Sequence, residues 1–336
     1  MRQDFYEACS NDTLNDALQV EKVDQVVQRL LRENQREYDI HVIRERVHEI
    51  TEIVRDFLTR CDQDGKPDEW HNFAVSLARH DHYALACEVL DRALALGRNK
   101  KNTDLLADYL QFGMCCNREE QCHVHYETLK NIHRVKYSWR AFSFSIDYLM
   151  HLWEESDTLE EMDRLEKEMF NLADDFQKYF PKLEEGYSSK ADIYSKLRMH
   201  DKVIETLEEA LKKLPRTPKC ALQLADAWFE ECEYKKALDA LSRAVKNANQ
   251  PQQGINSGYA RCLMGLSMLA DAELKGDAIT EELIRNVYLE FNLAVSREYR
   301  HAPYRNTVKE KTKEISLRYD VQVPMEFEDL HDLVSN

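Results

Sequence analysis

Glycine and proline are scarce in this chain, which has only 8 glycines and 7 prolines among 336 residues. Both residue types interrupt helices and form tight turns, so their scarcity favours long helices joined by short connections. Scarce glycine also makes phosphate-binding loops hard to build, and the sequence contains no Walker, Rossmann or nucleophile-elbow motif. We therefore expect an almost entirely helical protein without a nucleotide-binding loop.

Long apolar runs and an excess of basic residues are also missing. No run of about 18 apolar residues occurs, so we expect no membrane-spanning helix. The first residues, Met1 to Glu7, lack the apolar segment of a signal peptide. The formal net charge of −16 disfavours binding to nucleic acid or to an anionic membrane and favours neutral or basic partners. Nine scattered cysteines are typical of a reducing compartment, which predicts a cytoplasmic protein.

A 34-residue period is present in the second half of the chain. One copy contains Tyr187, Ala191, Tyr194, Val203, Leu207, Ala210 and Pro215. The next copy, one period later, contains Ala221, Ala225, Trp228, Ala237, Leu241 and Ala244. Small and apolar residues repeated at helical spacing with such a period are typical of stacked helix pairs. Solenoids of this kind present a long surface that usually binds a ligand.

Other segments extend this pattern in both directions. An earlier copy contains Trp70, Ala74, Leu77, Tyr83, Ala86, Leu90 and Ala93, and a later one contains Ala260, Leu263, Val287, Phe291 and Ala294. Between them we expect a degenerate pair over 101–135 and a longer pair over 138–181. The predicted organisation is an N-terminal helical pair over 1–65, with helices at 13–35 and 39–61, a solenoid over 66–303, and a C-terminal capping helix and tail over 304–336.

The frame resembles the tetratricopeptide repeat, or TPR. In that family small residues occupy positions 8 and 20 of each unit, where two helices cross closely. The matching pairs here are Ala74 with Ala86, Ala191 with Val203, and Ala225 with Ala237. Alanine replaces the family's glycine at position 8 in all three units. The resemblance implies an all-α, right-handed superhelical solenoid of about six or seven antiparallel helix pairs, the N-terminal pair included.

The resemblance also implies a binding groove. In TPR arrays the first helix of each pair lines the concave face, and positions 2, 5, 9, 12 and 13 contact ligands. In two well-matched units these positions are Glu185, Ser188, Asp192, Ser195, Lys196, Lys219, Leu222, Asp226, Phe229 and Glu230. Members that clamp a peptide C-terminus need Lys at position 5 and Asn at position 9, and this chain has Ser188 and Asp192 there. The acidic row with Phe229 suits a basic or amphipathic peptide, and acids that are merely exposed explain it equally well.

A cluster of cysteines and histidines is the main candidate for metal chemistry. It consists of Cys115, Cys116, Cys122, His123 and His125. The cluster lacks the short Cys-x₂₋₄-Cys knuckle of structural zinc sites, and buried cysteines acting as small hydrophobic residues explain it equally well. The segment from Asp62 to Asp68 lacks two ligands of a calcium loop, which favours a plain helix-connecting turn.

These observations favour a non-catalytic scaffold or adaptor that binds a protein or peptide and needs no cofactor. An alternative is a peptide-responsive intracellular regulator whose N-terminal helices act on a target protein. A third is a metal-dependent enzyme that uses the cluster from Cys115 to His125. A basic segment from Arg297 to Lys313 precedes an acidic tail from Met325 to Leu333. We therefore expect the tail to fold onto the last helices, or onto those of a second copy in a homodimer.

Overall fold

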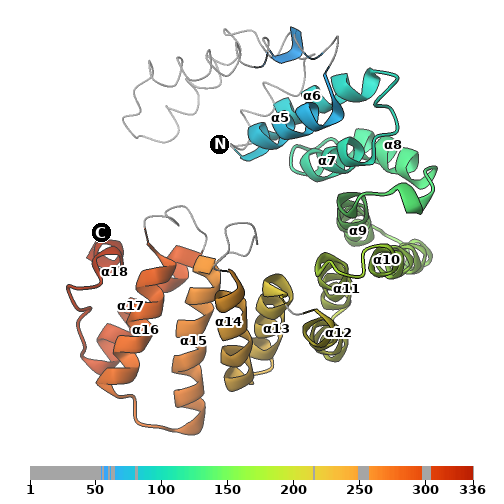
Figure 1. Cartoon of the computed structure of the whole chain (residues 1–336). Helices are drawn as coiled ribbons and strands as arrows, with labels where there is room; N and C mark the ends of the chain where they lie inside the picture. The colour runs from blue at the N-terminus through green and yellow to red at the C-terminus, as the bar shows by residue number, and fades with distance from the viewer. Residues whose placement is uncertain are drawn as a thin grey trace. The chain divides into compact units, whose positions relative to one another are not determined.

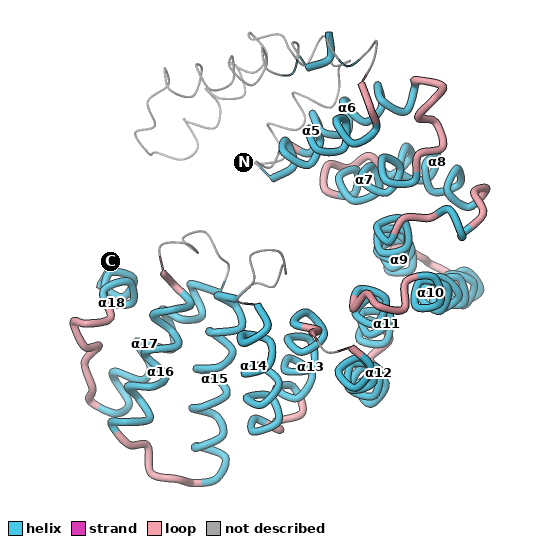
Figure 2. Tube along the Cα trace, viewed as in Figure 1, coloured by secondary structure: helices cyan, strands magenta, loops and turns pink. Residues whose placement is uncertain are grey.

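The structure is a computed structural model in which residues 54, 57–59, 61, 65–79, 82–214, 216–248, 257–296 and 304–335 are described. The described residues form helices and connections without strands, which confirms the all-α prediction (Figure 1 and Figure 2). No helix in this part of the chain is long and apolar enough to cross a membrane. The helix predicted over 13–35, most of the one predicted over 39–61, and Asp62 and Asp64 of the candidate calcium loop lie outside the described residues.

Two compact units divide the chain, one ending at Tyr179 and the other beginning at Phe180. We call them unit 1 and unit 2. The division falls inside the predicted solenoid, and the predicted boundaries near residues 65 and 303 stay predictions.

Unit 1 contains six described α-helices and one short 3₁₀ helix. They are α5 (Pro67–Arg79), α6 (Tyr83–Ala95), α7 (Thr103–Met114), α8 (Glu119–Lys130), η1 (Arg134–Lys136), α9 (Trp139–Glu154) and α10 (Leu159–Tyr179). Helix α5 packs on α6, α6 on α7, α7 on α8 and α9 on α10, and α7 also contacts both α5 and α9. The degenerate pair and the longer pair expected from the sequence are therefore α7 with α8 and α9 with α10.

Unit 2 contains eight α-helices among its described residues. They are α11 (Glu185–Lys196), α12 (His200–Lys213), α13 (Pro218–Glu230), α14 (Tyr234–Ala248), α15 (Ser257–Lys275), α16 (Glu281–Ala294), α17 (Tyr304–Tyr319) and α18 (Glu328–Ser335). Figure 1 shows α13 to α16 side by side, and consecutive helices from α11 to α16 pack together. The first helices of neighbouring pairs also meet, α11 with α13 and α13 with α15. This stacking of helix pairs is the TPR-like arrangement that the sequence predicts.

Small residues explain the close packing of the helix pairs in unit 2. Ala225 and Ala237 are fully buried, and Ala191 is 1% exposed. Ala191 and Ala225 belong to one continuous apolar core with Leu207 and Leu241. A methyl side chain at a crossing lets two helices approach closely, and a larger one would overpack the site. The repeat frame thus places its small residues where the helices need them.

The backbone repeats the same period. Arg198 and Cys232 both have positive φ angles, 56° and 58°, in the turns after α11 and α13. These two residues are one 34-residue period apart. Positive φ is uncommon for residues with a side chain, so its recurrence marks the same tight turn inside each helix pair.

The C-terminal tail folds onto the last helices of its own chain. Helix α18 packs on α16 and α17, and Phe327 and Leu330 are buried in their apolar cluster. The backbone N–H of Leu330 donates a hydrogen bond of 2.8 Å to the side-chain oxygen of Asn292. The tail therefore covers the end of unit 2, which is one of the two arrangements expected from the sequence.

Candidate peptide-binding groove

An acidic hollow lies between α11, the start of α12 and α13. Its volume is about 160 Å³, and its lining residues are Ala191, Asp192, Ser195, His200, Val203, Gln223, Asp226, Ala227 and Glu230. Four of the ten predicted groove residues are among them: Asp192, Ser195, Asp226 and Glu230. Each of the two aspartates directly follows a buried alanine of the repeat frame, Ala191 or Ala225. The frame therefore positions both carboxylates beside the crossings of the stacked first helices.

Each aspartate is held by a neutral donor on the next first helix. The Nε2 group of Gln223 donates to Oδ1 of Asp192 at 2.7 Å, which links α13 to α11. The hydroxyl of Tyr259 donates to Oδ1 of Asp226 at 2.6 Å, which links α15 to α13. The same interaction thus recurs one helix pair later and orients both side chains.

Burial makes these carboxylates harder to ionise. Desolvation raises the pKa of Asp192, although the charge of Lys219 and the bond from Gln223 oppose the rise. Desolvation also raises the pKa of Asp226 to about 6, and the nearby charge of Glu230 adds to the rise. Within the described part of the chain, neither aspartate forms an ion pair with a basic side chain. Both carboxylates therefore lie in a partly desolvated site without an ion-pair partner, and only Asp192 is partly compensated, by the charge of Lys219.

The rim of the acidic hollow is more exposed than its floor. Nδ1 of His200, the first residue of α12, lies 3.5 Å from Oε2 of Glu230 at the end of α13. Their side chains are 42% and 63% exposed, and Ser195 is also exposed. The hollow is therefore open to solvent and presents carboxylates, a hydroxyl and an imidazole. This set of groups can hold a cationic side chain, such as an ammonium or guanidinium group, by charge-assisted hydrogen bonds.

One predicted groove residue is fully buried. Ser188 is 0% exposed, and its hydroxyl has no hydrogen-bond partner among the described residues. The backbone N–H of Cys220 donates to Oε2 of Glu184 at 3.0 Å, which holds the beginnings of α11 and α13 together. Ser188 is therefore enclosed in this structure, and its predicted part in ligand binding stays a prediction.

The other five predicted groove residues lie outside the lining of the acidic hollow. They are Glu185, Lys196, Lys219, Leu222 and Phe229, and all are half-buried. The Phe229 ring packs edge-to-face against Tyr234, with a centroid separation of 5.3 Å. These residues flank the hollow on the first helices of unit 2, and their part in binding stays a prediction.

Two polar lining residues, Gln223 and His200, were not among the groove residues predicted from the sequence. Gln223 is at position 6 of its unit, a position that the family's contact set does not include. It lies 31 residues after Asp192, three short of a full period. The first helices of neighbouring pairs are therefore offset along their axes by about three residues. Counting 31 residues on from Asp192, rather than 34, identifies Gln223 in the sequence. His200 gives no such signal, because it reaches the hollow from the second helix of its pair.

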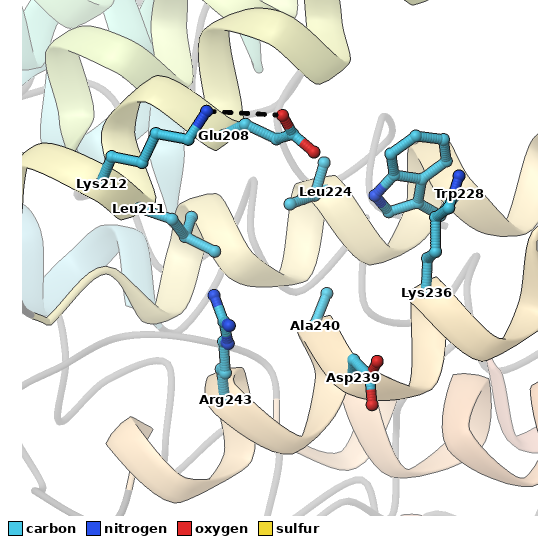
Figure 3. Close-up of a pocket in the computed structure, with 9 residues that line it drawn as sticks. All are labelled: Glu208, Leu211, Lys212, Leu224, Trp228, Lys236, Asp239, Ala240 and Arg243. Carbon is cyan, nitrogen blue, oxygen red and sulfur yellow. Dashed lines mark ion pairs between the residues drawn. The ribbon is translucent and has the colours of Figure 1, made fainter.

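A second hollow, of about 270 Å³, lies between α12, α13 and α14 (Figure 3). Its lining residues are Glu208, Leu211, Lys212, Leu224, Trp228, Lys236, Asp239, Ala240 and Arg243. Nζ of Lys236 lies 4.1 Å from the centroid of the Trp228 ring, in a cation–π contact. Lys212 pairs with Glu208 at 3.8 Å, and both side chains are well exposed. Acidic and basic side chains both line this hollow, so it does not attract ligands of one charge as the acidic hollow does.

Two members of the cluster of cysteines and histidines belong to the core of unit 1, whereas Cys115 and His123 are exposed. Cys116 and Cys122 are buried, and burial raises the pKa of the Cys122 thiol to about 12. The His125 ring packs against Tyr109, with a centroid separation of 4.3 Å. Over the described residues, no group of three or more His, Cys, Asp or Glu side chains is arranged to hold a metal ion.

Comparisons with known proteins concern the fold. No protein-family model and no curated protein matches the chain. Similar solved structures include TTC0263, a TPR protein of Thermus thermophilus, with a TM-score of 0.48 and 16% identity over 60% of this chain and 98% of that one. A tetratricopeptide repeat protein of Parabacteroides merdae gives 0.47 and 12% over 79% and 99%. Human IFIT1, solved as a dimer with m7Gppp-AAAA, gives 0.47 and 12% over 99% and 72%.

The helix pairs and buried small residues of the structure follow the TPR frame. The chain is TPR-like. TPR-like scaffolds usually mediate protein interactions, because stacked helix pairs present an extended binding surface.

Proposed function

We propose that this TPR-like chain is a non-catalytic scaffold or adaptor that binds a basic or amphipathic peptide segment of a partner protein. The binding site is the acidic hollow with the flanking first-helix residues of unit 2. Phe229 and Leu222 are half-buried apolar residues beside the carboxylates. Together these side chains provide a charged contact and an apolar contact, which an amphipathic peptide requires.

The observation that carries the proposal is the desolvation of Asp192 and Asp226, neither of which forms an ion pair with a basic side chain among the described residues. A desolvated carboxylate costs stability unless a cation or several donors compensate it. Each aspartate has one neutral donor, from Gln223 or Tyr259. A lysine or arginine of a ligand would supply the missing positive charge and offset that cost. Carboxylates with pKa values raised in this way cluster at functional sites.

A labelled synthetic peptide of alternating lysine and leucine tests the proposal, with a matched peptide of glutamate and leucine as the control. Fluorescence anisotropy should show binding of the basic peptide only, and added salt should weaken that binding. The double variant Asp192→Asn with Asp226→Asn should raise the Kd about tenfold, because two charge contacts are lost. Reversal of both aspartates to lysine should abolish binding.

The matched control variant is Glu208→Gln with Asp239→Asn, which removes two carboxylates from the second hollow of the same unit. It should bind the basic peptide as the unmodified chain does. Equal loss of affinity in both double variants would show that the net charge of the protein, rather than the acidic hollow, attracts the peptide.

The regulator alternative depends on the N-terminal helices, most of which lie outside the described residues, and stays a prediction. The enzyme alternative depends on the cluster from Cys115 to His125, where Cys115 alone of the three cysteines is exposed. We also propose a cytoplasmic location and no binding to nucleic acid or membrane, on the basis of cysteine content and net charge. A homodimer through the C-terminal region stays a prediction.

A further inference from the structure

Two buried thiols lie within reach of each other in unit 1. Sγ of Cys87 in α6 is 3.7 Å from Sγ of Cys116, which follows α7 and is 29 residues further along the chain. Cys87 is 0% exposed and Cys116 is 7% exposed. Neither Cys87 nor Cys116 is in a disulfide in this structure.

Ion pairs beside the thiols hold the same two segments together. Arg118, two residues after Cys116, pairs with Glu88, the residue after Cys87. Its guanidinium also contacts Asp91 of α6, with an N–O distance of 2.9 Å. The segments that carry the two sulfur atoms are therefore fixed relative to each other.

A third thiol nearby is arranged differently. Sγ of Cys122 lies 3.9 Å from each of the backbone oxygens of Tyr109 and Leu110 in α7. Gly113 makes room for it, because an added Cβ at that position would lie 2.4 Å from this sulfur. Cys122 is thus directed at backbone oxygens of α7. The Cys116 thiol also donates to a backbone oxygen of that helix, that of Phe112 at 3.3 Å, and in addition its sulfur faces that of Cys87.

We propose that Cys87 and Cys116 are a redox modification site, at which a hydroperoxide converts the two thiols into a reversible disulfide. An S–S bond is about 2.0 Å long, so the sulfur atoms must approach by less than 2 Å, which is about the range of a side-chain rotation. The bond would join α6 to the turn between α7 and α8, and so would link two consecutive helix pairs of unit 1.

The chemistry assigns different roles to the two thiols. The thiol hydrogen bond from Cys87 lowers the pKa of Cys116, burial opposes this, and the charge of Arg118 lowers it again. Burial raises the pKa of Cys87 well above its ordinary value. Cys116 is also the more exposed of the two, so it is the thiol that meets the oxidant first.

The reaction balances in two steps. The Cys116 thiolate attacks one peroxide oxygen, the O–O bond breaks, and a sulfenic acid forms while hydroxide leaves and takes up a proton. The Cys87 sulfur then attacks the Cys116 sulfur, the S–O bond breaks, and water leaves with the thiol proton of Cys87. One hydroperoxide is reduced and two thiols are oxidised to one disulfide. A small dithiol reverses the reaction by thiol–disulfide exchange.

Peptide mapping of the full chain tests the proposal. The folded protein is treated with hydrogen peroxide, the remaining thiols are alkylated, and the unreduced protein is digested and analysed by mass spectrometry. We expect a cross-linked peptide pair containing Cys87 and Cys116, lighter by two hydrogens than the separate peptides. Dithiothreitol should remove the cross-link. Because the new bond closes a loop, the Tm of the oxidised protein should rise by several degrees.

Single variants sharpen the assignment. Cys122→Ala should form the cross-link as the unmodified chain does. Cys87→Ala should leave the sulfenic acid on Cys116, where dimedone traps it. Pairing of Cys116 with Cys115 or Cys122, or complete alkylation of Cys87 after peroxide treatment, would overturn the proposal. The mapping of the unmodified chain decides the question even if a variant fails to fold, and its result is independent of peptide binding in unit 2.

Discussion

In unit 1, a carboxylate on α7 is enclosed by side chains that can carry positive charge, whereas the comparable carboxylates of unit 2 contact only neutral donors. Asp108 is 1% exposed and bonds to Nδ1 of His71 on α5. Arg140 of α9 lies 3.5 Å from the same ring nitrogen. Asp192 and Asp226 bond instead to a glutamine amide and a tyrosine hydroxyl.

The difference shows how one repeat frame gives two outcomes. Desolvation raises the pKa of Asp108, but the bond from His71 and the charges of His71 and Arg140 oppose the rise. At Asp226 the neighbouring charge of Glu230 adds to the rise. Unit 1 therefore compensates its buried acid with basic side chains, whereas no basic charge opposes the rise at Asp226 in unit 2.

The largest expected effect comes from breaking the compensated network of unit 1. Asp108→Ala leaves His71 without its carboxylate partner and opens a cavity between α5 and α7. We expect a loss of about 3 kcal/mol in the free energy of unfolding, measured by urea denaturation.

The control for this variant is Asp104→Ala on the same helix. Asp104 is 3.6 Å from Arg140, and its side chain is 44% exposed, so its loss should cost about 0.5 kcal/mol or less. Equal destabilisation by the two variants would mean that the network around Asp108 contributes no more than a surface ion pair.

The next largest effect is expected from a variant at the helix crossing beside the acidic hollow of unit 2, where Ala225 lies. Ala225 is fully buried and precedes Asp226, so Ala225→Leu should overpack the core and displace the carboxylate. We expect a destabilisation of about 1–3 kcal/mol by thermal or chemical unfolding, together with weaker peptide binding. Ala95→Leu, at an exposed position ending α6, should change stability little. Unchanged stability of Ala225→Leu would contradict the repeat frame.

The smallest effect has the opposite sign. Asp226→Asn should stabilise the protein by about 1–2 kcal/mol at pH 7, because the pKa of Asp226 in the folded state, about 6, exceeds its ordinary value of 3.8. Because the folded state binds the proton of Asp226 more tightly than the unfolded state does, this residue adds to the stability of the fold in full below pH 3.8. The added stability is lost as the pH rises through 6. Asparagine resembles the protonated acid, so the gain should disappear near pH 4.

Urea denaturation at several pH values measures this effect. Asp201→Asn, at an exposed position in α12, is the control and should show little dependence on pH. Destabilisation by Asp226→Asn at pH 7 would indicate that this carboxylate is compensated within the chain, as Asp108 is, and would remove the contrast between the units.

Much of the fold follows from spacing within short segments. The 34-residue frame located the helix pairs α11 with α12 and α13 with α14, because small and apolar residues at helical spacing must face a neighbouring helix. The same helical phase located α7 and α8, although they match the repeat poorly. The candidate site was predicted in part. Asp192 and Asp226 line the acidic hollow, while Ser188 is buried by packing that no local pattern reveals.

The sequence by itself determined the helical class, the repeat and the row of acids, because these depend on residue types at fixed local intervals. Tertiary structure decided which side chains meet. Asp192 contacts Gln223, 31 residues away, rather than its equivalent one full period later. Cys87 faces Cys116 across 29 residues, and His71 reaches Asp108 across 37. Each of these separations depends on the offset between neighbouring helices, which the packing of whole helix pairs sets.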